Sequence, residues 1–307
     1  MTTPCYSPSG QVPASGKRAV IVAALAVVPG AWCYAWTTAP APSVFNIVCI
    51  AGLGLWLVLV ARTAARLGKV PNPRWMGRAG AALGAWAWYV HWAAWVAMSG
   101  RLAPELQVPA SLAGATYLCV RPDLVFGVAA EIVAGASSAV AGAALVVVWS
   151  VEFFVFLATP RLAGIYRASE PFCEQTASWA EEIHVPVEFE FINDPDAVRC
   201  RLRHNPGDLL SILVPCREDM PRFSDVTIHH CRGGTSFFTV CNMEVMSAGQ
   251  IPLREVRKLQ EALPDKVVSY GQVDEPVVEL LPIEVEDVEA LLLDWELAAS
   301  NRPAMHS

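Results

Sequence analysis

The sequence predicts an α-helical membrane bundle of four transmembrane helices followed by a small cytoplasmic α+β domain. Three observations predict this fold class: long apolar runs in the first half, basic residues sorted between the joining segments, and an acidic composition after Arg167. Each run has about 18–21 residues, the length that a helix needs to cross a ~30 Å hydrocarbon layer. The predicted spans are Arg18–Trp36, Phe45–Ala64, Ala79–Met98 and Ala139–Thr159.

The basic residues predict how the spans are oriented. With the N-terminus inside, the outward segments carry only Arg101 and Arg121. The inward segments carry Lys17, Arg18, Arg62, Arg66, Lys69, Arg74, Arg78, Arg161 and Arg167. Because Lys and Arg gather on the cytoplasmic side of membrane proteins, this bias predicts a multi-pass protein with both termini in the cytoplasm.

The chain therefore divides into three predicted parts. Residues 1–17 form a polar N-terminal tail, residues 18–167 form the transmembrane domain with an external segment at 100–138, and residues 180–300 form the cytoplasmic domain. Hydropathy alone leaves open whether Leu124–Ala134 is a short helix on the outer membrane surface or part of a span. We favour the surface helix, because an additional span would place Arg161 and Arg167 outside.

The two halves of the chain differ in charge. Residues 1–169 hold 11 Lys and Arg against 4 Asp and Glu, whereas residues 170–307 hold 11 against 25. The net charges are therefore +7 and −14. An acidic domain is repelled by nucleic acid, so we expect no nucleic-acid partner. Membrane lipid and a protein partner, or a second copy of the chain, are the expected contacts.

The third predicted span carries a packing pattern. Gly80 and Gly84 have the four-residue spacing that lets membrane helices approach closely. Trp88, Trp92 and Trp95 follow at helical spacing and form one stripe. We expect these five residues to pack the bundle, with part of the stripe in the outer interfacial belt; an aromatic wall that binds a ligand is the alternative.

Several elements are predicted in the cytoplasmic domain. Val185–Ile192 alternates as a half-buried strand, and Asp194-Pro195 is a helix start. Asp225–Cys231 and Ser236–Val245 form a hairpin around a Gly233-Gly234 turn, in which residue i faces residue 467 − i. The remaining predicted elements are an amphipathic helix at Pro252–Leu263, a strand at Val267–Tyr270 and a helix at Val285–Glu296.

Two ionisable residues lie within predicted spans. His91 and Glu152 are candidates for a ligand site or an ion or proton pathway, because buried ionisable groups in membranes are costly and are often functional. The predicted boundaries place His91 about 10 Å and Glu152 about 20 Å from the outer ends of their spans, by the ~1.5 Å rise per residue. We therefore expect them at different depths, unless a boundary is shifted.

The sequence predicts no catalytic residue, metal or cofactor. His229, His230, Cys231 and Cys241 cluster in the predicted hairpin. The expected register places Cys231 and Cys241 on opposite faces and separates His229 from His230, so these residues alone cannot form a tetrahedral zinc site. No Cys–His signature or phosphate-binding loop is evident, so an enzyme is the less favoured class.

The order of several short stretches resembles an uncharacterised family of four-span bacterial inner-membrane proteins. The stretches are Ser15–Lys17, Pro42–Asn46, Leu67–Val70 with Asn72, Tyr89–Trp95, Arg121–Leu124 and Ser169–Glu174. The resemblance covers roughly residues 15–180 and implies the four-span layout, a cytoplasmic C-terminal part and a location in the inner membrane. It implies no activity. Family members carry Pro-Phe-Cys-Glu-x-Cys, whereas Thr176 replaces the second Cys here.

Two functions are consistent with these features. The first is a binding, sensing or protective role, as a scaffold or immunity-like partner, through the acidic cytoplasmic domain. The alternative is a small transporter or an ion- or proton-conducting protein that uses His91 and Glu152.

Overall fold

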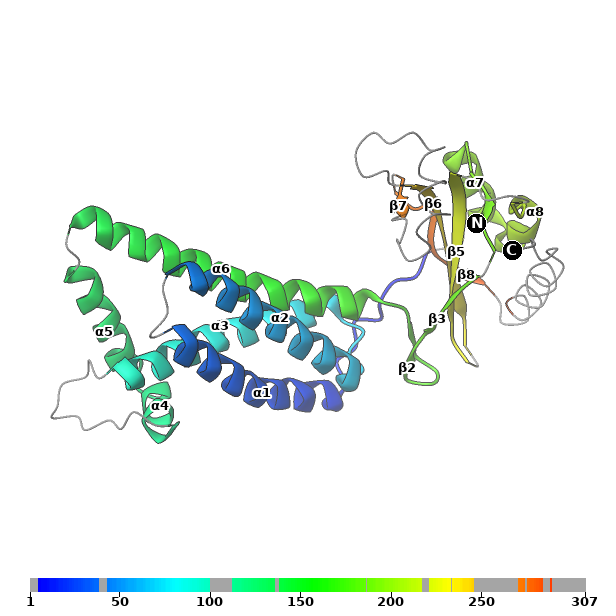
Figure 1. The fold of residues 1–307 in the computed structure, drawn as a ribbon. Helices are drawn as coiled ribbons and strands as arrows, with labels where there is room; N and C mark the ends of the chain where they lie inside the picture. Colours follow the sequence, from blue (N-terminus) through cyan, green and yellow to red (C-terminus); the bar gives the residue numbers. More distant parts are fainter. Residues whose placement is uncertain are drawn as a thin grey trace, which may run out of the picture. The chain divides into compact units, whose positions relative to one another are not determined.

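The computed structural model describes residues 5–38, 43–99, 112–135, 138–185, 187–216, 221–232, 234–245, 270–273, 275–283 and 288. The chain forms two compact units, which we describe separately. The helical unit comprises residues 8–170, and the sheet unit combines residues 1–7 with residues 171–307. Figure 1 shows the helices of the first unit in blue to green and the central strands of the second in yellow.

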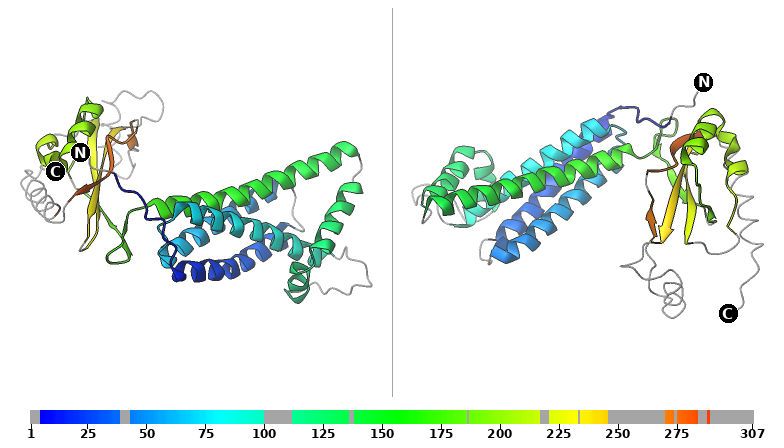
Figure 2. Two further views of the ribbon diagram at one scale, coloured as in Figure 1. Left: turned by 180° about the vertical axis from the view of Figure 1, so that it is seen from behind. Right: turned by 90° about the horizontal axis from the view of Figure 1, so that it is seen from above.

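Four long helices build the helical unit, and they run side by side in both views of Figure 2. They are α1 (Ala14–Thr38), α2 (Ser43–Gly68), α3 (Pro73–Ser99) and α6 (Ala139–Ser169). Helix α1, residues Asn46–Gly68 of α2, and α6 are each long and apolar enough to span a membrane. Three of the four predicted spans thus coincide with candidate membrane helices.

The third predicted span lies in α3, which is not among those candidates. With 27 residues α3 is long enough to cross a bilayer, so its composition sets it apart. Its sequence contains five Trp residues with Tyr89, His91 and several glycines, all of which lower the mean hydropathy. The helix is therefore confirmed, while the prediction that it crosses the membrane is not.

Glycines bring α3 and α6 into close contact. A Cβ atom added at Gly84 would overlap the carbonyl oxygen of Phe156, and one at Gly80 would overlap that of Pro160. Both pairs obey one rule, in which residue i of α3 lies opposite residue 240 − i of α6. The two helices are therefore antiparallel, and their register is fixed where the backbones touch.

The segment between α3 and α6 contains two shorter helices, α4 (Leu112–Cys119) and α5 (Pro122–Ala134). Helix α5 ends at Ala134 with Gly135 as its C-cap, and Ser138 caps the start of α6 by accepting a hydrogen bond from the Ala141 amide at 3.2 Å. Leu124–Ala134 is therefore separate from the following helix. Thirteen residues span about 20 Å, too short to cross a bilayer.

The sheet unit is built around one antiparallel pair of long strands. β5 (Arg222–His230) pairs with β6 (Ser236–Val245). Strands β3 (Glu181–His184) and β4 (Phe189–Glu190) both pair with β5, and β7 (Tyr270–Gln272) and β8 (Val278–Ile283) both pair with β6. A separate two-stranded ribbon joins β1 (Phe172–Cys173) to β2 (Ser178–Trp179).

Short helices cover one side of this sheet and complete its core. They are α7 (Pro195–His204), the 3₁₀ helix η2 (Pro206–Asp208) and α8 (Leu209–Ile212). Leu202 of α7 and Leu209 of α8 belong to one buried cluster with Val226, Ile228 and Phe238 of the central strands. Alternate residues of β5 thus face the helices, and the predicted α+β domain is confirmed in this part of the chain.

The predicted elements of the sheet unit have mixed outcomes. The helix start is confirmed: Asp194 accepts a hydrogen bond from the Ala197 amide at 3.0 Å, and α7 begins at Pro195. The predicted strand at Val185–Ile192 is wrong in extent, because among its described residues only Phe189 and Glu190 form a strand. The predicted elements at Pro252–Leu263 and most of Val267–Tyr270 and Val285–Glu296 lie outside the described residues.

The hairpin is confirmed, but its predicted register is wrong by one residue. Ile228 faces Phe238 and Val226 faces Val240, so residue i pairs with 466 − i. The strands are joined by residues 231–235, where the Cys231 amide donates to the Ser236 hydroxyl at 3.1 Å. A five-residue connection therefore replaces the predicted two-residue turn and shifts every cross-strand pair.

The N-terminal segment belongs to the sheet unit. The Tyr6 amide donates to the Leu280 carbonyl at 2.9 Å, and the Tyr6 hydroxyl accepts a hydrogen bond from the Phe172 amide at 3.2 Å. Its ring packs edge-on against Phe237, with 4.9 Å between ring centroids. Burial raises the pKa of Tyr6 to about 12. The start of the chain is thus tied to the domain that follows the last long helix.

Candidate functional site

Three helices of the bundle bring polar side chains together. The Tyr34 hydroxyl of α1 donates a hydrogen bond to Oε1 of Glu152 on α6 at 2.7 Å. Nδ1 of His91 on α3 lies 3.7 Å from the same oxygen. The rings of Tyr34 and His91 meet edge to face, with 4.6 Å between their centroids. We call Tyr34, His91 and Glu152 the polar cluster.

The polar cluster is enclosed by aromatic side chains. His91 and Glu152 are each 5% exposed. Phe156 packs edge-on against Tyr34 at 5.5 Å, and Trp92 lies 5.5 Å from His91, both measured between ring centroids. Burying an unpaired charge in such surroundings is costly, so the carboxyl group must be neutralised by its own proton or by a protonated His91.

The separation of 3.7 Å leaves His91 without a hydrogen bond at Nδ1. Within the described part of the chain, buried polar atoms without a hydrogen-bond partner also include the indole nitrogens of Trp88 and Trp92 and the hydroxyl of Thr159. Such atoms are places where water or a ligand group can bind, because buried polar groups are rarely left unpaired. His91 and Trp92 lie beside each other, so the Trp92 ring, with its unpaired indole nitrogen, adjoins the cluster.

The structure corrects the predicted depths of His91 and Glu152. The sequence placed them about 10 Å apart in depth by helical rise, yet they are in contact. The reason is the register set at Gly84 and Phe156, which places residue 149 of α6 opposite His91. Glu152 lies less than one turn from that position. The C-terminal end of α3 and the N-terminal end of α6 are therefore staggered, whereas the prediction assumed that they were level.

Tyr34 was not predicted as a site residue. A single Tyr in an apolar helix is common, and no spacing links it to His91 or Glu152 in the sequence. The feature that could have identified it is the Tyr34 hydroxyl group, since a buried Tyr usually has a hydrogen-bond partner. Only the tertiary structure brings Glu152 of α6 within reach of the Tyr34 hydroxyl.

The predicted packing residues of α3 lie at helix contacts. Gly80 and Gly84 face α6, as described above. Trp88 packs against Phe153 at 5.1 Å, and Trp92 packs against Trp149 at 4.7 Å between ring centroids. Trp92 also packs against Trp95, which is partly buried. Trp88 and Trp92 of the stripe thus lie between α3 and α6.

The cysteines and histidines of the sheet unit lie differently from the predicted arrangement. Cys241 faces Asp225 and His229 faces Phe237, so Cys241 and His229 share one side of the hairpin. Among the described residues, no group of three or more His, Cys, Asp or Glu side chains is placed to hold a metal ion.

A pair of thiols was missed by the sequence reasoning. Cys173 and Cys231 lie within hydrogen-bond reach of each other, and both are free and buried. Burial raises the pKa of Cys173, but hydrogen bonds from Thr176, Cys231 and the Gln175 amide outweigh it and hold the pKa below its ordinary value. Burial raises the pKa of Cys231 to about 12. Thr176 thus hydrogen-bonds the Cys173 thiol with both its side chain and its backbone amide.

Comparisons with protein-family models, with curated proteins and with solved structures gave no match.

Proposed function

We propose that this chain is a four-span membrane protein that conducts protons, or couples transport to them, through Tyr34, His91 and Glu152. The observation that carries this proposal is the buried Glu152 carboxyl group, hydrogen-bonded to Tyr34 at 2.7 Å with His91 Nδ1 at 3.7 Å. Ionisable groups inside membrane bundles commonly serve proton relays.

The fourth span is supported by the course of the chain. Tyr6, eight residues before α1, and Phe172, three residues after α6, are in contact within the sheet unit. A soluble domain holding both ends of the bundle lies on one side of a membrane, so the chain between them must cross an even number of times. Three apolar helices are candidates, and α3 supplies the fourth crossing.

The orientation follows from the charges. The nine-to-two distribution of Lys and Arg favours both termini in the cytoplasm, and the family resemblance favours a bacterial inner membrane. Reporter fusions test this topology: fusions at Ser43 and within 100–111 should be active outside, and one after Ser307 should be active inside. An external C-terminal reporter would contradict the proposal.

The proposed chemistry needs one proton shared by two groups. With the proton on Glu152, both Glu152 and His91 are neutral; with the proton on His91, the two form an ion pair. Net charge is zero in both states, so the exchange avoids leaving an unbalanced charge in the membrane. A shift of about 1 Å would bring Nδ1 and Oε1 within hydrogen-bond range. Tyr34 would hold the carboxyl group in place during the exchange.

Proton flux into proteoliposomes tests this function. The full chain is reconstituted with an internal pH-sensitive dye, and a potassium diffusion potential drives protons inward. Glu152→Gln should lower the flux at least tenfold, because an amide cannot carry the proton but can still accept from Tyr34. Glu131→Gln is the matched control, since Glu131 is exposed on α5. Equal flux in wild type and Glu152→Gln would refute the proposal, provided that both variants keep the wild-type melting temperature.

A second candidate function is binding, sensing or scaffolding through the acidic domain. The observation that favours it is the exposed edge strand β3, where Glu181 and Glu182 face solvent, in a region with a net charge of −14. A basic protein surface, or a second copy of the chain, is the proposed partner. A partner recovered with the full chain from native membranes should be lost when both residues are changed to Gln. A partner retained by that variant would contradict binding at this edge.

A further inference from the structure

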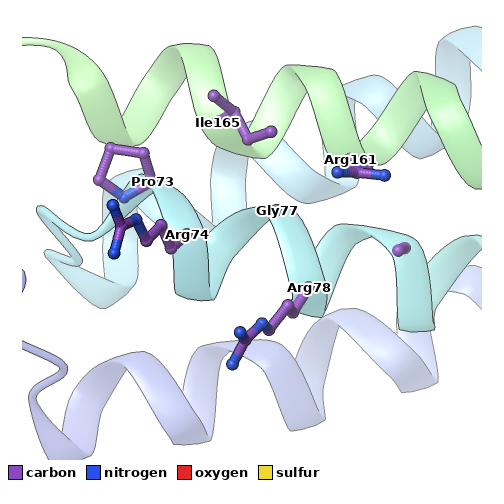
Figure 3. A pocket seen from close by; sticks show the side chains of 7 residues that line it. Pro73, Arg74, Gly77, Arg78, Arg161 and Ile165 are labelled. Atoms are coloured by element: carbon purple, nitrogen blue, oxygen red, sulfur yellow. The ribbon is translucent and has the colours of Figure 1, made fainter.

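A cavity between α3 and α6 is lined by three arginines. Arg74 and Arg78 come from α3 and Arg161 comes from α6, as Figure 3 shows. The cavity has a volume of about 430 Å³, and Pro73, Gly77, Ala81 and Ile165 complete its lining. It lies wholly within the helical unit.

The charge of these arginines is not balanced by the described part of the chain. No described carboxylate lies within 4.0 Å of Arg74, Arg78 or Arg161. Glu170, the residue that follows α6, already pairs with Arg62 and Arg167. Three cations around one hollow create a positive potential that an anion would neutralise.

The remaining lining of the cavity is apolar. Gly77 has no side chain, and a Cβ atom placed there would lie 2.8 Å from the side chain of Ile165. The two helices therefore approach closely at Gly77, and the three arginines line the cavity around this contact. Guanidinium groups bind phosphate through paired N–H donors, which suits arginines beside an apolar wall to binding a phosphate group.

We propose that this cavity binds the phosphate head group of an anionic phospholipid. A lipid is favoured over a soluble phosphate because the cavity adjoins apolar surface on α6, where Leu162 is 50% and Tyr166 is 72% exposed. Exposed Tyr is typical of the membrane–water interface, and basic pockets between membrane helices on the cytoplasmic side bind anionic head groups. The acyl chains would lie along α6.

This proposal rests on the proposed membrane topology but not on proton conduction. The polar cluster and the cavity consist of different residues. A variant can therefore lose lipid binding without losing proton flux, and the reverse. Failure of the reporter fusions would overturn the topology, whereas lipid binding is measured on purified protein.

Native mass spectrometry of the full chain in neutral detergent tests the site. The protein is titrated with phosphatidylglycerol and with phosphatidylcholine of the same acyl chains. We expect phosphatidylglycerol to be retained preferentially, and each of Arg78→Gln and Arg161→Gln to weaken its retention about fivefold, with about 25-fold for the double variant. Arg18→Gln is the charge-matched control, because Arg18 is exposed on α1 outside the cavity.

The other outcomes overturn the proposal. Equal retention of the two lipids would show that the head-group charge is not recognised. An equal loss in Arg18→Gln and the cavity variants would show a general effect of charge. If millimolar inorganic phosphate alone raised the melting temperature as much as phosphatidylglycerol and displaced it, the ligand would be a soluble phosphate. The melting temperature of each variant without lipid checks that it is folded.

Discussion

Replacing Gly84 with Ala should destabilise the bundle at the contact between α3 and α6. The added methyl group would overlap the Phe156 carbonyl oxygen and would lie 2.8 Å from its carbonyl carbon and 3.0 Å from the Leu157 Cα. Carbon and oxygen atoms in contact stay about 3.3 Å apart, so relieving the overlap with the carbonyl oxygen would move α6 by more than about 1 Å. Backbone atoms on both sides leave no flexible side chain to absorb that movement.

Overpacking of this kind costs about 1–3 kcal/mol. For a unit of this size, each kcal/mol shifts the melting temperature by about 2–4 °C, so we expect a fall of roughly 2–12 °C. Thermal unfolding of the full chain in detergent, followed by the fluorescence of its 11 Trp residues, measures this change. Because Phe156 is one turn from Glu152, the same variant should also reduce proton flux.

Gly52→Ala provides the control for the change in helix propensity. Gly52 lies in α2 with no atom within 4 Å of an added Cβ, so this variant should be as stable as wild type or more so. The difference between the two Gly→Ala variants isolates the effect of the close contact. If Gly84→Ala had the same melting temperature as Gly52→Ala, α3 would not be tightly packed against α6. The register that explains the polar cluster would then be wrong.

Three further predictions concern the sheet unit in the full chain. Asn242→Ala should lower the free energy of unfolding by about 1–3 kcal/mol in a denaturant titration. The reason is that the buried Asn242 amide hydrogen-bonds Ser224 and both backbone groups of Ile192. The control, Asn193→Ala at an exposed position, should change this free energy by less than about 0.5 kcal/mol. The pH at which alkylation of Cys173 is half-maximal should lie below the ordinary thiol range and well below that of Cys231, since the thiolate is the reactive form; the reverse order would contradict the hydrogen bonds to Cys173. Tyr6→Ala should make the N-terminal segment sensitive to protease while the domain stays folded, and an unchanged cleavage rate would show that this segment is not held by the sheet.

Local patterns in the sequence predicted the elements of this protein better than their pairing. The start of α7 at Pro195 follows from a capping Asp and a Pro, whose effects act within one turn. The two hairpin strands follow from alternating side chains. The register between them depends on the conformation of the connection at residues 231–235, and the Gly233-Gly234 pair indicated a shorter turn than the one that forms.

The predicted membrane helices show the same limit. Apolar length identified α1, α2 and α6, because crossing a hydrocarbon layer is a requirement on each helix by itself. The sequence also predicted a span in α3, but that helix is not among the candidate membrane helices, since its Trp, Tyr, His and Gly residues lower its hydropathy. The contact of Tyr6 with Phe172 bears on that question, but it joins residues 166 positions apart and has no signal in the sequence.

The sequence by itself determined that His91 and Glu152 are ionisable groups within apolar helices, because residue type and hydropathy are local properties. The tertiary structure decided that they meet, and that Tyr34 joins them. Distances along separate helices are measured from ends that need not be level, whereas the close contact at Gly84 and Phe156 fixes how far α3 slides along α6. That register, set by which backbones can touch, converts two distant polar residues into one cluster.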